Sequence, residues 1–82
     1  MLATLASLTS ANRIKRAANE LGVYVNVIQT PHILAKDGCG YSLRFEDVEK
    51  RFIENTASEL GIKIRAFYVE VTESSKILYK KL

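Results

Sequence analysis

The sequence Glu20-Leu21-Gly22-Val23-Tyr24-Val25 occurs a second time, in modified form, as Glu59-Leu60-Gly61-Ile62-Lys63-Ile64. Glycine at this place commonly ends a helix, because it adopts a left-handed backbone conformation at little cost. The alternating β-branched residues that follow it are typical of a strand. Each segment therefore marks a joint between a helix and a strand, and the repeat predicts two β-α-β units in one chain.

Two helices are predicted on the N-terminal side of these glycines. The first begins near Thr9 or Ser10, in a cluster of residues that cap helices. Its apolar residues recur at helical spacing, namely Ala11, Ile14, Ala18 and Leu21. The second begins with the acidic run 46–49, which the helix dipole favours in a first turn. Its apolar stripe consists of Val48, Phe52, Ile53, Ala57 and Leu60.

Four strands are predicted around the helices, over residues 2–6, 23–28, 41–45 and 62–71. The second strand stops at Thr30-Pro31, because proline has no N–H to donate to a sheet. In the fourth strand the apolar phase shifts near Ala66, which indicates a bulge or a strong twist. The segment 76–79 predicts either a further short strand or a turn of helix, and we expect Lys80-Lys81 to fray.

Joined by right-handed crossovers, these elements predict an α+β fold of the ferredoxin-like split βαβ type, in the order βαββαβ. Its four-stranded antiparallel sheet carries two helices on one face. The first and second strands are parallel, with the third inserted between them. We expect this domain over residues 1–71, followed by a basic C-terminal extension over residues 72–82. The loop before the third strand then shares a rim with the start of the first helix.

Composition excludes several classes of protein. The chain has 82 residues, 48% of them hydrophobic and 26% charged, which is typical of one globular domain. No apolar run approaches the ~18 residues of a membrane span, and the first residues lack the basic region of a secretory signal. One cysteine forms no internal disulfide, which fits a reducing compartment. We therefore expect a cytoplasmic protein that does not bind to membranes.

Nucleic-acid binding is not expected either. The net charge of +3 comes partly from three lysines among the last seven residues. The RNA-recognition motif shares the predicted fold, but its third strand needs a basic residue and stacking aromatic residues. Aligning the glycines puts Asp37 at the basic position and Cys39 at a stacking position. The sequence therefore lacks the surface on which that motif stacks bases.

The residues that could take part in a reaction lie in the loop before the third predicted strand. Cys39 is the only cysteine, and it lies between Gly38 and Gly40. Only a thiolate attacks or accepts sulfur well, and flanking glycines leave the sulfur accessible. A nearby helix start, at Ser7, Thr9 and Ser10, would stabilise the anion. The alternative is that Cys39 is a small buried hydrophobic residue at the start of a strand.

The same loop supplies two weaker candidates. His32 could accept a proton from Cys39 and Lys36 could favour the thiolate, although we favour a solvated loop histidine for His32. One cysteine and one histidine do not make a metal site, and no cofactor motif occurs. No second catalytic group is evident. A carrier or binding protein is therefore a better prediction than an enzyme.

The spacing from Thr30-Pro31 to Cys39-Gly40, which leads into Tyr41–Arg44, resembles that of a small prokaryotic family of Se/S carrier-like proteins. The resemblance extends over about residues 2–71. It implies that Cys39 carries sulfur or selenium between a donor and an acceptor protein. From the sequence itself we expect Gly38, Gly40 and Pro31 to shape the loop that supports Cys39. Serines often precede the cysteine in that family, whereas Asp37-Gly38 does so here. An acidic neighbour opposes thiolate formation.

Two functions follow from these residues. The first is a carrier that holds a persulfide or a selenium-bearing sulfur on Cys39 and passes it to a partner enzyme. The alternative is a non-catalytic ferredoxin-like module that binds a small ligand or a protein and works as a homodimer through a sheet edge or face. Tyr24, Tyr68 and the tail are candidates for that interface. The choice between sulfur and selenium stays open.

Overall fold

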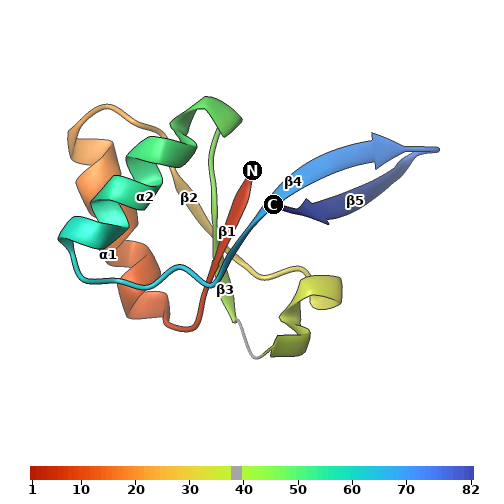
Figure 1. Cartoon of the computed structure of the whole chain (residues 1–82), viewed down its shortest axis with the longest axis horizontal. Coiled ribbons are helices and arrows are strands. Elements are labelled where there is room, and N and C mark those ends of the chain that lie inside the picture. The colour runs from red at the N-terminus through yellow and green to blue at the C-terminus, as the bar shows by residue number, and fades with distance from the viewer. Residues whose placement is uncertain (38–39) are drawn as a thin grey trace.

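A computed structural model describes residues 1–37 and 40–82 (Figure 1). Its helices and strands, in chain order, are β1 (Leu2–Leu5), α1 (Leu8–Glu20), β2 (Asn26–Gln29), the 3-10 helix η1 (His32–Asp37), β3 (Tyr41–Arg44), the 3-10 helix η2 (Asp47–Glu49), α2 (Lys50–Glu59), β4 (Ala66–Glu73) and β5 (Lys76–Lys81). Helices α1 and α2 have 13 and 10 residues. Among the described residues, no helix is long and apolar enough to cross a bilayer.

The strands form one antiparallel sheet in the order β2-β3-β1-β4-β5. Strand β3 lies between β1 and β2 and is antiparallel to both, so β1 and β2 are parallel, as predicted. The prediction of four strands is wrong, because β5 adds a fifth beside β4. Each neighbouring pair is antiparallel. The α+β class and the two helices are confirmed.

The fifth strand exists because a tight turn reverses the chain after β4. Glu73 pairs with Lys76, and the two residues between them, Ser74 and Ser75, have φ values of 50° and 65°. Positive φ at both central residues is the type I′ geometry that suits the twist of a hairpin. Lys80 and Lys81 pair with residues of β4, so the expectation that they fray is wrong.

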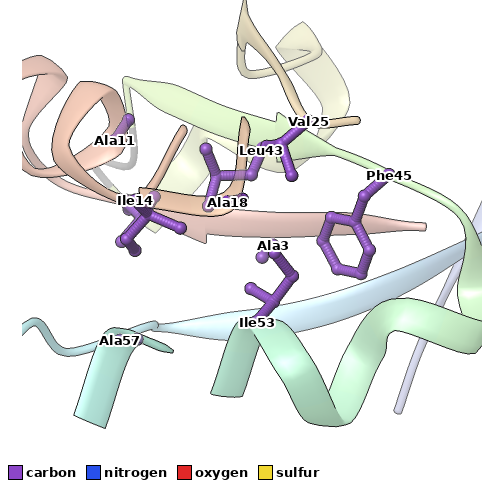
Figure 2. Packing of buried hydrophobic residues seen from close by; sticks show 10 residues of the cluster. Ala3, Ala11, Ile14, Ala18, Val25, Leu43, Phe45, Ile53 and Ala57 are labelled. Carbon is purple, nitrogen blue, oxygen red and sulfur yellow. The ribbon is translucent and has the colours of Figure 1, made fainter. Parts of the chain in front are cut away.

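Both helices pack on the same face of the sheet. Ala3 and Leu5 of β1 alternate along the strand, and both join one buried cluster with residues of α1 and α2. The cluster consists of Ala3, Leu5, Ala11, Ile14, Ala18, Val25, Leu43, Phe45, Ile53 and Ala57. Figure 2 shows these side chains between the strands and the two helices. Hydrophobic burial of this single layer holds the helices on the sheet.

Several predicted boundaries need correction. Leu21 and Val48 were expected in the apolar stripes, but they are 71% and 82% exposed. Leu21 caps the end of α1, and Val48 lies in η2 before α2 begins, so neither follows the spacing of its neighbouring α-helix. Strand β2 begins at Asn26 and not at residue 23. Gly22 and Gly61 have the left-handed conformation predicted for them, with φ of 80° and 69°.

Of the bulge or strong twist predicted near Ala66, the bulge is wrong. Ala66 pairs with Thr4 and begins β4, and the next two residues continue the same register along β1. The residues before Ala66 run outside the sheet. The change of apolar phase at this point therefore reflects the start of the strand.

Candidate functional site

The ends of three strands form one rim of the sheet. Leu5 at the end of β1 and Gln29 at the end of β2 both pair with Tyr41, the first residue of β3. Gly40 directly precedes Tyr41 and is exposed. Gly38 and Cys39 lie outside the described residues. The described chain thus brings their neighbour Gly40 to the rim, which faces downward in Figure 1.

The start of α1 lies at the same rim, because only two residues separate β1 from the helix. Ser7 caps it: its Oγ accepts a hydrogen bond from the Ser10 N–H at 3.3 Å. The first turn of α1 contains no acidic residue. The partial positive charge of the helix start is therefore not neutralised by its own side chains. Ser7 and Thr9 are exposed, and Ser10 is partly buried.

The loop after β2 is partly helical. Pro31 precedes η1, and its carbonyl accepts a hydrogen bond from the Leu34 N–H at 2.8 Å. His32 and Lys36 are both exposed residues of η1. Because a 3-10 helix has three residues per turn, positions four apart point in different directions. The structure therefore places His32 and Lys36 in one short helix without bringing them onto one face.

Two hydroxyl groups fasten the base of this loop. The Thr30 Oγ1 and the Ser42 Oγ lie 2.8 Å apart in a buried hydrogen bond. The Thr30 N–H also donates to the Gly40 carbonyl at 3.1 Å. The chain on both sides of the loop is thus joined by one side-chain and one backbone hydrogen bond. Sequence reasoning missed Thr30 and Ser42 as a pair, because Thr30 was interpreted only as the place where the second strand stops and Ser42 only as a polar position of the third.

The segment before β4 adds two exposed cationic residues at the same end of the sheet. The Arg65 N–H donates to the carbonyl of Thr4 at 2.9 Å, which fixes the backbone of this segment near the end of β1. Lys63 and Arg65 are both exposed. Neither was assigned to the site from sequence. Their alternation with Ile62 and Ile64 was interpreted as part of a strand, which concealed their position at the rim.

The described part of the chain contains no cluster of three histidine, cysteine, aspartate or glutamate residues that could hold a metal ion. What it does contain is an exposed rim made of strand ends, a capped helix start and a fastened loop. The arrangement can present a group on the loop to another molecule. Gly40 leaves room for that approach, since a Cβ added to it would meet no atom within 4 Å.

These features define a two-layer α+β domain that holds one loop at the edge of an antiparallel sheet. Residues 1–69 match the family model described as "Putative Se/S carrier protein-like". The chain therefore belongs to this family, and the resemblance inferred from its sequence is confirmed. No curated protein and no solved structure matches the chain. The family match includes the whole loop and ends within β4, before the turn to β5.

Proposed function

We propose that the protein is a carrier that holds sulfur or selenium covalently on Cys39 and passes it to an acceptor protein. The observation that supports this proposal most strongly is the family match, which spans the only cysteine of the chain. The exposed rim around the loop supports it further. A carrier needs its cargo at a surface that two partners can reach in turn, and it needs no deep substrate cavity.

The proposed loading step is an exchange at sulfur. The Cys39 thiolate attacks the outer sulfur of a persulfide on the donor protein, and a new sulfur–sulfur bond forms as the donor's sulfur–sulfur bond breaks. The donor leaves as a thiolate, so no external oxidant or reductant is consumed. With selenium, the transferred atom is the outer selenium of the donor's selenium-bearing cysteine. Attack by an acceptor thiolate on the same outer atom reverses the exchange and regenerates the Cys39 thiolate.

The rim residues have supporting roles in this proposal. The uncompensated start of α1 at Ser7, Thr9 and Ser10 favours an anion on the neighbouring loop. Lys36 adds a positive charge, and His32 is the candidate proton acceptor. Asp37 precedes Cys39 by two residues in the sequence, and an acidic neighbour opposes thiolate formation. Gly38 and Gly40 leave space for the partner's sulfur or selenium.

Hydrogen bonds at the base of the loop hold the two ends of the loop in fixed positions. The backbone hydrogen bond from the Thr30 N–H to the Gly40 carbonyl and the hydroxyl hydrogen bond between Thr30 and Ser42 hold the two strand ends together. We therefore expect the base of the loop to keep its geometry when a partner approaches.

We propose a cytoplasmic location, since a reducing compartment keeps a single thiol free. We also propose that β1 to β4 form a ferredoxin-like unit, supported by the strand order β2-β3-β1-β4.

Thiol reactivity tests the proposal against a purely structural cysteine. We expect the alkylation rate of Cys39 to reach half its maximum at a lower pH than that of free cysteine. The matched variant is Ser7→Asp, which places a carboxylate at the start of α1 and should move this midpoint upward by neutralising the helix dipole. A thiol that stays unreactive in the folded protein, yet reacts after unfolding, would favour the alternative of a non-catalytic binding module.

A further inference from the structure

The β4–β5 hairpin projects beyond the helices that cover the rest of the sheet (Figure 1). Phe67 marks the side of the hairpin that faces the helices, because its ring packs edge-on against the ring of Phe45 in the core. The two ring centroids lie 6.4 Å apart. Strand alternation and the register of the hairpin then define this side, here called the hairpin face. Its members are Val69, Val71, Glu73, Lys76, Leu78 and Lys80.

The centre of the hairpin face is apolar and open. Val71 and Leu78 are paired across the two strands and are 40% and 44% exposed. Leu82 continues the same side and is 60% exposed, and its N–H donates to the Phe67 carbonyl at 3.0 Å. Contiguous exposed apolar side chains on a small domain commonly mark an interaction surface. Charged residues flank them, with Glu73 and Lys76 paired next to the turn.

We propose that the hairpin face binds the hairpin face of a second copy of this chain. The arrangement of charged residues on the hairpin face supports this pairing. Two facing sheets related by a two-fold axis parallel to the strands place β4 of one copy over β5 of the other, turn over turn. Glu73 then lies over the partner's Lys76, and Lys76 over the partner's Glu73. Val71 lies over the partner's Leu78, so the apolar centre is covered in the same arrangement.

Other symmetric arrangements are less favourable. An axis across the strands would place Lys76 over the partner's Lys80, which brings like charges together. Edge-to-edge pairing of two β5 strands in the full-length antiparallel register would place Lys76 opposite the partner's Lys81 at both ends. Like charges in directly opposed positions are destabilising. The charges thus select face-to-face packing with β4 over β5, and lysines on an edge strand are a common protection against edge pairing.

Sedimentation equilibrium of the full chain, in the presence of a reductant, tests this proposal. We expect the average mass to rise with concentration from the 9.2 kDa of one chain toward twice that value. Leu78→Ser should abolish the rise. The matched control is Ile77→Ser, which changes an exposed residue of the same strand that lies on the opposite face. A monomer at every concentration, or equal effects of the two changes, would overturn the proposal.

Reversing the charge of Glu73 or of Lys76 distinguishes an effect on association from an effect on the folding of the hairpin. Glu73→Lys and Lys76→Glu each place two like-charge contacts in the dimer, so each variant alone should associate about tenfold more weakly. A mixture of the two variants should regain association, because every intermolecular contact is then between opposite charges while each hairpin keeps its internal like-charge pair. A mixture no stronger than its components would contradict the proposed packing. Cys39→Ser should leave the mass unchanged, so this test is independent of the proposed carrier function.

Discussion

Strands β1 and β5 belong to one antiparallel sheet but have opposite environments. All four residues of β1 are buried, whereas none of the six residues of β5 is buried. Strand β1 has a neighbour on each side and two helices on one face, while β5 is an edge strand of a projecting hairpin. The family match includes β1 and ends before β5. The difference indicates that the region around β1 is held by the buried core, whereas β5 is held by its pairing with β4 and exposes its side chains.

The largest expected difference between these regions is in stability. Ile53→Ala removes a fully buried side chain of the helix layer and should lower the free energy of unfolding by about 3 kcal/mol. Ile77→Ala makes the same chemical change at a position that is 56% exposed on β5, and it should cost less than about 1 kcal/mol. Urea unfolding at equal protein concentration measures both. Equal losses would show that the hairpin is as much a part of the core as α2.

The next effect concerns the hydrogen bond that fastens the loop. Ser42→Ala leaves the hydroxyl of Thr30 without its partner in a buried place, which should cost about 1–3 kcal/mol. Combining it with Thr30→Val removes both hydroxyl groups, so the double variant should lose less than the sum of the two single variants. Denaturant unfolding of all four proteins gives the coupling free energy. Strict additivity would show that the two groups do not stabilise each other.

Within the body of the fold, the glycines that end the helices and the glycine at the rim should respond differently to alanine. Gly22→Ala and Gly61→Ala force a side chain into the left-handed conformation and should each cost about 1 kcal/mol. Gly40→Ala meets open space and should change stability little. Thermal unfolding compares the three variants. If Gly40→Ala proves the most destabilising, the rim is packed more tightly than the described contacts indicate.

The smallest effect is expected for the ion pair that connects the two regions. Arg44 of β3 and Glu70 of β4 lie 2.7 Å apart, on the face of the sheet opposite the helices. The Arg44 side chain is 53% exposed, so Glu70→Gln should cost no more than about 1 kcal/mol. High salt should shrink the difference from the unchanged protein, since ions screen exposed charges. A cost that stays the same in high salt would indicate a shielded pair.

The body of the fold could be predicted from sequence because its signals are local. Gly22 and Gly61 end the helices where the repeated pattern places them, and the short connections between elements leave few strand orders. The hairpin could not be predicted with the same certainty. Its turn uses Ser74 and Ser75, whereas the turn signal that sequence analysis relies on is Asn-Gly or Asp-Gly.

The candidate site was predicted in part. The loop before β3 and the cluster of capping residues before α1 follow from local sequence, although α1 begins at Leu8 after the Ser7 cap and not near Thr9 or Ser10. The hydrogen bond between Thr30 and Ser42 depends on how the chain leaves β2, because Thr30 follows the last residue of that strand while Ser42 pairs with Ile28, and a pattern of alternation does not specify this. Lys63 was missed for a similar reason, because residues 62–65 alternate like a strand but lie before β4.

The central claim is that Cys39 accepts sulfur or selenium from a donor protein. Mass spectrometry of the intact chain, after incubation with a cysteine desulfurase and cysteine, tests the sulfur case most directly. We expect the chain to gain the mass of one sulfur atom on Cys39, and we expect Cys39→Ser to gain nothing under the same conditions. A folded, reduced protein that acquires no sulfur, or one that acquires it equally without Cys39, would contradict sulfur transfer through this residue.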